Sequence, residues 1–282
     1  AKELAERGPH LVLHRRGDLG ERGRGAARER ALQHLDDVLM VEGAANVAAI
    51  IIESVVGTNG ILVPPDGYLQ GIRERCDRHG IIMICDEVMA GFGRCGEWFA
   101  VNKWNVTPDL ICFAKGVNSG YIPVGGVIIS DPIAATFDDR VFPGGLTYSG
   151  HPLACASIVA TITAMEDEGV VDNARMIGND VLGPGLSELA SRHNMIGDVR
   201  GSGVFWAIEL VRDRATREPL VPFNAAGADN KPMVDVITAC KAQNLWPFTH
   251  FNRVHVVPPL VITDQEMRDG LAIIDEALNV AD

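Results

Sequence analysis

The sequence predicts an α/β fold in which a larger domain with a mostly parallel sheet precedes a smaller α+β domain. Two continuous apolar runs, over residues 81–85 and 110–114, have the length and composition of buried parallel strands. Residues 68–78 carry apolar side chains at helical spacing and follow a third apolar run over 47–52. This order of strand, helix and strand is typical of parallel α/β organisation.

The larger domain is expected over residues 29–168, where apolar runs of strand length alternate with helical segments. Pro64 and Pro65 precede the helix over 68–78, which is a helix-start signal. A Val-Ile-Ile run within 125–130 predicts another buried strand. The expected elements are a helix over 31–40, strands over 47–52, 81–85, 110–113 and 125–130, and a long helix over 152–168 that follows a loop over 142–150.

The smaller domain is expected over residues 169–282, because the character of the chain changes at Val170. A helix comes first, two strand-like runs follow over 203–211 and 254–257, and an amphipathic helix over 264–279 closes the chain. Helices and strands that do not alternate predict an α+β unit, which we expect to pack on the first domain.

Residues 1–28 do not share this pattern and are left unassigned. The stretch LVLHRRGDLGERGRGAARER is rich in arginine and glycine and has neither helical nor strand periodicity. It can be a flexible basic arm, an arm that binds nucleic acid but lacks interleaved aromatic residues, or non-native sequence from a frameshift. We favour the frameshift as a hypothesis.

Charge and cysteine usage exclude several classes of protein. The 282-residue chain has a formal net charge of −12, which argues against a nucleic-acid partner. No apolar run approaches the roughly 20 residues that span a bilayer, and the secretory signal pattern is absent, so we expect a cytoplasmic protein without a membrane partner. The cysteines are scattered, which predicts buried thiols in a reducing compartment, with no disulfide and no metal site; they are Cys76, Cys85, Cys95, Cys112, Cys155 and Cys240.

An acid and a lysine follow two of the predicted strands. Asp86 ends the run over 81–85 and Lys115 ends the run over 110–114. In an open α/β sheet, ligands collect in the crevice outside the carboxyl ends of the strands. A lysine there can form a Schiff base with pyridoxal phosphate, while an acid keeps the pyridine nitrogen protonated so that the ring accepts electrons.

The surroundings of the two residues favour this interpretation over simpler ones. Lys115 lies between Phe113-Ala114 and Gly116-Val117, which we expect to desolvate its ammonium. Val88 lies two residues beyond Asp86, so in an extended segment both side chains point the same way. The simpler interpretations are a solvated surface lysine and an acid that caps a helix or turn.

A glycine pattern nearby indicates a different cofactor but has the wrong context. Gly91, Gly93 and Gly96 match the GxGxxG fingerprint of dinucleotide-binding domains and follow a strand. The acidic pair that starts at Asp86 separates strand and glycines, and no acidic residue ends a second strand about twenty residues later. We therefore do not predict a dinucleotide site.

Several ordered motifs resemble class III pyridoxal-phosphate-dependent aminotransferases. They are IIIESVVG, DEVMAGFGR, DLICFAKGVNSG, GGLTYSGHPLACA, VRGSGVFWAIEL and VPPLVIT, and the likeness runs from about residue 29 to the C-terminus. The resemblance implies the fold type I architecture, the cofactor pyridoxal phosphate and a homodimer. It implies transfer of an amino group from an ω-amino acid or amine, of the taurine, β-alanine or 4-aminobutyrate type, to an oxo acid such as pyruvate or 2-oxoglutarate. An aminomutase or a decarboxylating member of the same fold remains an alternative.

The resemblance also implies roles for matching residues. Lys115 corresponds to the Schiff-base lysine that moves the proton between substrate and cofactor, and Asp86 to the partner of the pyridine nitrogen. Val88 would lie beneath the ring, and Thr147 would reach the phosphate in the site of the partner subunit. Glu53 matches the glutamate that gates the carboxylate pocket; its simpler interpretation is a solvated acid at a strand end.

Two positions depart from the family pattern. Met89 stands where the family often has a glutamine that contacts the ring hydroxyl, and a thioether cannot donate that bond. His255 stands where the family commonly has an arginine for the substrate carboxylate. Arg253 would point to the same side of a strand as His255 and can supply the charge; otherwise it pairs with an acidic neighbour.

The third departure concerns the length of the chain. Family members carry a substantial N-terminal portion with the glycine/serine phosphate cup, an aromatic residue stacked on the cofactor and much of the dimer interface. The likeness here starts only near residue 29, so we expect a truncated chain that folds poorly or binds its cofactor weakly. A truncated, non-catalytic homologue is therefore the rival to an active enzyme.

Overall fold

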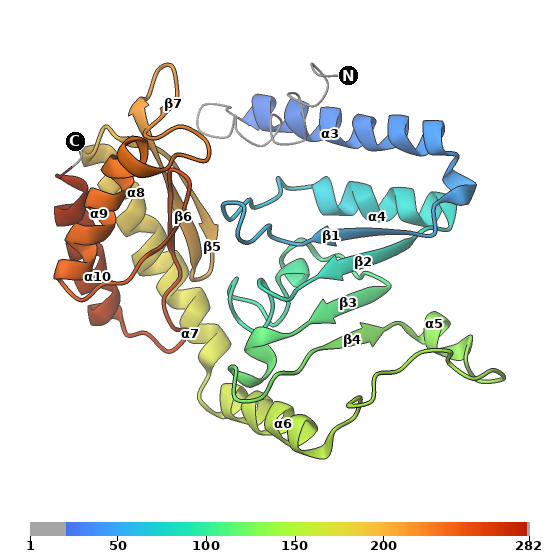
Figure 1. The fold of residues 1–282 in the computed structure, drawn as a ribbon. Helices are drawn as coiled ribbons and strands as arrows, with labels where there is room; N and C mark the ends of the chain where they lie inside the picture. Colours follow the sequence, from blue (N-terminus) through green and yellow to red (C-terminus); the bar gives the residue numbers. More distant parts are fainter. Residues whose placement is uncertain (1–20, 281–282) are drawn as a thin grey trace.

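A computed structural model describes residues 21–280 of the chain and divides them between two sheets (Figure 1). The first sheet has the strand order β1-β2-β3-β4, and the second has the order β5-β6-β9-β8 with β7 paired to β6. Helices α3 and α4 lie along the β1 side of the first sheet, whereas α8, α9 and α10 lie together beside the second (Figure 1). Among the described residues, no helix is both long and apolar enough to cross a lipid bilayer.

Three strands of the first sheet are parallel, as predicted. They are β1 (Ala49–Glu53), β2 (Ile82–Asp86) and β3 (Leu110–Phe113). Their apolar residues pack with α4 (Tyr68–His79), which presents Leu69 and Ile72 to the same core. The predicted α/β class with a mostly parallel sheet is therefore confirmed.

The fourth strand differs from the prediction of a buried strand. Strand β4 (Gly126–Ile129) runs antiparallel to β3 at the edge of the sheet. Its residues Val127, Ile128 and Ile129 are 44–53% exposed. Residues 114–125 contain only the short turn η4 (Lys115–Asn118) and no crossover helix, so the chain returns alongside β3 in the opposite direction.

The first described helix starts earlier than predicted. Helix α3 (Glu21–Glu42) includes residues 21–28, for which the sequence indicated no regular structure. The alanine, arginine and glutamate residues there favour a helix, which offsets the cost of the interspersed glycines. Arg75 of α4 binds Asp36 of α3 at 2.6 Å, and this hydrogen bond lowers the pKa of the Asp36 carboxyl group.

Short helices and one longer helix connect the strands and complete the first part of the chain. Helix α6 exposes Leu153 and Val159, which are 63% and 64% exposed, along its outer side. The connecting elements are η2 (Ala44–Asn46), η3 (Ala100–Trp104), α5 (Asp131–Ala135) and α6 (Pro152–Asp167).

The second part of the chain is built on an antiparallel sheet with helices packed on one face, the α+β arrangement predicted. The strand-like runs expected over 203–211 and 254–257 correspond to β6 and β9. The helices are α7 (Val170–Met176), η5 (Ile177–Leu182), α8 (Gly183–Arg192), η6 (Gly227–Asn230), α9 (Lys231–Ala242) and α10 (Asp264–Leu278), and the strands are β5 (Ile196–Ser202), β6 (Phe205–Asp213), β7 (Glu218–Pro219), β8 (Phe248–His250) and β9 (Arg253–Val256).

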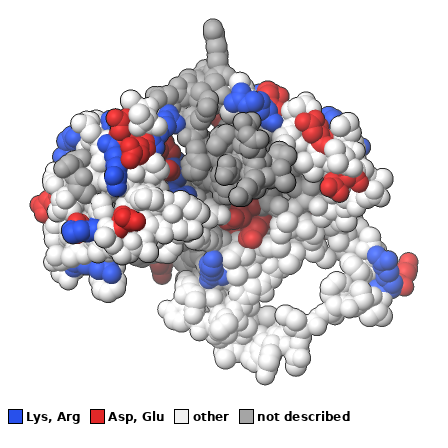
Figure 2. Space-filling view, turned by 45° about the horizontal axis from the view of Figure 1, so that its top comes forward, with Lys and Arg blue, Asp and Glu red and all other residues white. Residues whose placement is uncertain are grey.

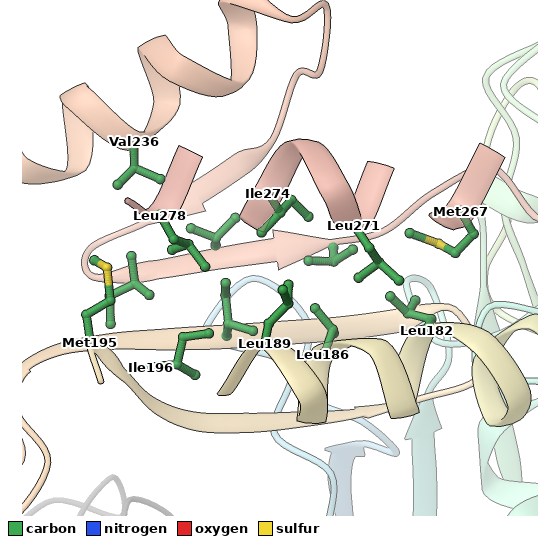
Figure 3. Packing of buried hydrophobic residues seen from close by; sticks show 14 of the residues in the cluster. Leu182, Leu186, Leu189, Met195, Ile196, Val236, Met267, Leu271, Ile274 and Leu278 are labelled. Atoms are coloured by element: carbon green, nitrogen blue, oxygen red, sulfur yellow. The ribbon is translucent and has the colours of Figure 1, made fainter. Parts of the chain in front are cut away.

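The two faces of this sheet differ in character. On one face, Ile208 and Val254 pack into an apolar core with α8 and α10, and Figure 3 shows side chains of both helices pointing into the same layer. The register aligns Arg200 of β5, Ala207 of β6 and His255 of β9 in one row across the sheet. Because side chains alternate along a strand, this row lies on the opposite face. We call it the polar face because it carries the buried polar residues Arg200, Arg253 and His255. Phe205 and Ala207 of the same face pack into the hydrophobic core of the first sheet.

Removal of a side chain from this core should destabilise the protein strongly. Leu186 of α8 is fully buried, so Leu186→Ala is expected to lower the free energy of unfolding by about 2–5 kcal/mol. Leu153→Ala on the exposed side of α6 is the matched control and should change it by less than about 0.5 kcal/mol. Urea denaturation followed by circular dichroism measures both, and equal effects would contradict this assignment of the core.

The polar face should make stability depend on pH through His255. Burial, followed by the charges of Arg253, Arg200 and His250, lowers the pKa of His255 from 6.5 to about 4. The unfolded chain then takes up the proton first, so stability is full above about pH 6.5 and decreases as the pH falls toward 4, by up to about 3 kcal/mol. His255→Phe should flatten this dependence in urea denaturation between pH 7 and 4.5. The exposed control His34→Gln should retain it, and equal pH dependence in all three proteins would refute the role of His255.

Candidate active site

The carboxyl ends of the three parallel strands bring three of the predicted site residues to one edge of the sheet. Glu53 of β1 is in register with Asp86 of β2, and Asp86 is in register with Cys112 of β3. Lys115 follows Cys112 by three residues, in the turn η4. The edge therefore carries two acids and a lysine on three adjacent strands.

The carboxylate of Asp86 is held by the backbone just after its own strand. Its Oδ1 accepts a hydrogen bond from the N–H of Val88 at 2.9 Å, and both residues are half-buried. An acid that accepts a backbone N–H has its direction fixed without a cation beside it. Asp86 is thus oriented by the same DEV segment that contains the residue predicted to contact the ring.

Glu87 has a structural role that the sequence did not reveal. It is fully buried, and its carboxylate accepts the backbone N–H groups of Ala100 and Val101 at 2.9 and 2.8 Å. Burial raises the pKa of Glu87, while these backbone hydrogen bonds oppose that rise. The adjacent acids Asp86 and Glu87 were the feature of the sequence from which this role could have been inferred. One acid faces the edge of the sheet, and the other anchors the start of η3.

Lys115 is exposed, which corrects the expectation that its neighbours desolvate its ammonium. The turn η4 buries Val117 and Asn118 instead, and the Asn118 side chain donates to the backbone oxygen of Ile122 at 2.6 Å and to Ser157 of α6 at 3.1 Å. Lys115 itself has φ of +47°, a left-handed conformation that is uncommon outside glycine. The buried side chain of Asn118 thus fixes the turn, whereas the side chain of Lys115 is exposed to solvent.

The loop after β1 lies against Met89. The Glu53 Oε2 atom accepts the N–H of Gly57 at 2.9 Å, and the Thr58 hydroxyl lies 3.6 Å from the sulfur of Met89. A Cβ on Gly57 would come within 2.5 Å of the same sulfur, so a larger residue there would displace the Met89 side chain. Met89 therefore packs against the loop that follows Glu53.

Thr147 is distant in sequence from these residues, in the segment between α5 and α6, where residues 138–151 are all exposed. Helix α5, where the segment begins, lies at the opposite end of the sheet from the carboxyl ends of β1, β2 and β3 (Figure 1). The lower part of the molecule in Figure 2, which contains this segment and α6, shows few charged side chains. The role of Thr147 stays a prediction.

Arg253 and His255 lie on the polar face of the second sheet. Their exposed fractions are 8% and 5%. The Arg253 Nη1 atom donates to the backbone oxygen of Asn59, in the loop after β1. The Arg253 Nε and His255 Nε2 atoms are buried and bond to no group in residues 21–280. The structure therefore places Arg253 against the loop that follows Glu53 and His255 two residues further along β9. The substrate role of both residues stays a prediction.

The sequence and the structure were compared with those of known proteins. The family model described as aminotransferase class-III matches residues 13–278, so the match begins inside the arginine- and glycine-rich segment over 1–28. Taurine–pyruvate aminotransferase of Bilophila wadsworthia is 34% identical over 257 residues, which are 89% of this chain and 56% of the relative. Putrescine–pyruvate aminotransferase of Pseudomonas aeruginosa is 40% identical over 189 residues, which are 67% of this chain and 41% of the relative.

Solved structures agree with this result. Taurine:2-oxoglutarate aminotransferase from Bifidobacterium kashiwanohense, in complex with PLP and glutamate, superposes with a TM-score of 0.89 at 37% identity. The match covers 95% of this chain and 59% of that one, so the chain spans a little over half the length of its relatives. With a family model that matches nearly the whole sequence and the same fold in its relatives, the chain belongs to the class-III aminotransferase family.

Proposed function

We propose that the chain is part of an aminotransferase that moves an amino group from an ω-amino acid or amine to an oxo acid such as pyruvate or 2-oxoglutarate. The observation that carries this proposal is the placement of Asp86 and Lys115 at the carboxyl ends of adjacent parallel strands. The names of relatives, which act on taurine, putrescine and 5-aminovalerate, support a donor of the ω-amino type. A taurine or β-alanine type of donor is the more specific proposal.

The residues at this edge fit pyridoxal phosphate as the cofactor. A primary amine and a carboxylate are the two groups that its aldehyde and its ring nitrogen require. Lys115 would bind the aldehyde carbon, Asp86 would hold the protonated ring nitrogen, and Val88 would contact the ring face. When bound, the cofactor supplies an electron sink for the carbon that carries the amino group.

The chain's own residues would then perform proton transfer and orientation. The exposed amine of Lys115 can take the proton from the donor carbon and later return it. The carboxylate of Asp86, oriented by the N–H of Val88, keeps the proton on the ring nitrogen. Glu53 would control access to the pocket for the substrate carboxylate, because the N–H of Gly57 holds the Glu53 side chain at the carboxyl ends of the parallel strands.

We propose further that the functional form is a homodimer in which Thr147 reaches the phosphate in the partner's site. Apolar residues are exposed in the segment around Thr147: Val141, Leu146 and Tyr148 are 90%, 83% and 81% exposed. Large exposed apolar patches commonly mark protein interfaces. This surface supports an interface that includes the segment between α5 and α6.

A non-catalytic homologue is the second candidate function. It is favoured by the exposure of Lys115. An aminomutase or decarboxylating enzyme would use the same Lys115 and Asp86. Substrate assays separate these reactions once cofactor binding is established.

Reductive trapping should label Lys115 selectively. Pyridoxal phosphate followed by borohydride is expected to add the reduced cofactor to the peptide that contains Lys115, as measured by peptide mass spectrometry. Lys115→Ala should lose this label, and Lys231→Ala, which removes an exposed lysine paired with Asp235, should keep it. Labelling spread evenly over the lysines and unchanged by Lys115→Ala would support the non-catalytic alternative.

Neutralising Asp86 should weaken cofactor binding without disturbing the fold. Asp86→Asn keeps the shape of the side chain but removes the charge that favours a protonated ring nitrogen. We expect the dissociation constant of pyridoxal phosphate to rise at least about tenfold, which corresponds to about 1.4 kcal/mol. Asp77→Asn, at an exposed acid that pairs with Arg73, is the control. Absorbance titration measures all three proteins, and equal constants would exclude the proposed contact.

A further inference from the structure

Three side chains from the second sheet bind three consecutive backbone oxygens of one loop. The Nδ1 atom of His250 lies 3.1 Å from the oxygen of Thr58, Arg253 donates to the oxygen of Asn59, and the Nε atom of Arg200 donates to the oxygen of Gly60 at 2.7 Å. We call Arg200, His250 and Arg253 the clamp, and residues 57–60 the β1 loop. The clamp residues come from three different strands, β5, β8 and β9.

The clamp is built into the polar face and is not a chance surface contact. Arg200 is 6% exposed, and its Nη1 atom binds Asp198 at 2.6 Å and Glu209 at 2.8 Å. These two acids compensate its charge and hold the guanidinium in one orientation. Glu209 is in register with Arg253 on the neighbouring strand. One donor of each arginine binds the β1 loop, Nε of Arg200 and Nη1 of Arg253.

The β1 loop is shaped to receive the clamp. Gly60 has φ of +120°, a backbone conformation that residues with a Cβ rarely adopt. A Cβ at this position would lie 2.5 Å from Nη1 of Arg253 and 2.8 Å from Nη2 of Arg200. Any other residue would therefore push both guanidinium groups away from the oxygens that they bind.

The other side of the β1 loop contacts the proposed cofactor-binding segment. Gly57 donates its N–H to Glu53, and the hydroxyl of Thr58 lies 3.6 Å from the sulfur of Met89. Met89 directly follows Val88 and lies three residues after Asp86. The β1 loop therefore lies between the clamp on one side and Glu53 and Met89 on the other.

We propose that Arg253 is a positioning residue which, with Arg200 and His250, holds the β1 loop against Met89. In this way the second sheet determines the position of Glu53 at the edge of the first. This inference rests on the proposed function for the meaning of that position. It assigns Arg253 to the backbone of the β1 loop instead of the substrate carboxylate, because the guanidinium is buried against Asn59.

Hydrogen exchange tests the clamp directly on the full chain without cofactor. Arg253→Met keeps most of the side-chain volume but removes the donors, so amides over residues 57–62 should exchange at least tenfold faster while those of β6 keep their protection. Arg253→Lys retains a donor and should restore most of the protection. Arg268→Met, at an exposed arginine of α10 that pairs with Asp264, should change nothing in this loop.

A second variant and a second signal separate positioning from a general effect on folding. In ¹³C-methyl spectra, Arg253→Met and Gly60→Ala should both shift the Met89 methyl signal, whereas Arg268→Met should not. Unchanged exchange in residues 57–62 or an unmoved Met89 signal would overturn the proposal. A uniform increase of exchange through β5, β6 and β9 would also overturn it, because Arg253 would then only stabilise the second sheet.

The two proposals can fail separately. Loss of selective labelling at Lys115 would refute the aminotransferase function while leaving the exchange result intact. If the backbone amides of the β1 loop show no protection from exchange in a chain that still traps pyridoxal phosphate at Lys115, the clamp alone is refuted.

Discussion

The register of three parallel strands is the constraint on which the rest of this structure depends. The hydrogen-bonded ladders of β1, β2 and β3 place Glu53 beside Asp86, and Asp86 beside the strand that leads to Lys115. A slip of one residue would turn the apolar faces of these strands outward, so burial of Met83 and Cys85 maintains the register. The same strand register therefore determines both which residues form the hydrophobic core and where the site residues lie.

Adjacent acids serve opposite purposes in this arrangement. Asp86 remains half-buried at the edge, whereas Glu87 is buried and bound to backbone N–H groups at the start of η3. A buried carboxylate is costly unless hydrogen bonds compensate its lost hydration. Because Glu87 receives them, the segment after β2 has one anchored acid and one acid available for a ligand.

The two sheets meet through apolar and polar contacts together, since Phe205 and Ala207 of β6 join the hydrophobic core of the first sheet. The second sheet sends Ile208 and Val254 into its own helices and turns Arg200, Arg253 and His255 to the other side. Backbone oxygens of the loop after β1 accept hydrogen bonds from Arg200 and Arg253. Hydrogen bonds to charged donors are directional, so they define the position of the loop more narrowly than apolar packing would.

The sequence by itself determined the parallel strands and the chemistry at their ends, since both depend on residues that are close along the chain. Apolar runs of strand length led directly to Asp86 and Lys115, and the motifs around them indicated the family. Only the tertiary structure decided the antiparallel direction and exposure of β4, the exposure of Lys115, the burial of Glu87 and the contacts of Arg253. The hydrogen-bonded residues Arg253 and Asn59 are 194 residues apart in the sequence, and Arg200 and Gly60 are 140 residues apart. Local patterns carry no information about such pairs, because the fold alone brings them within hydrogen-bonding distance.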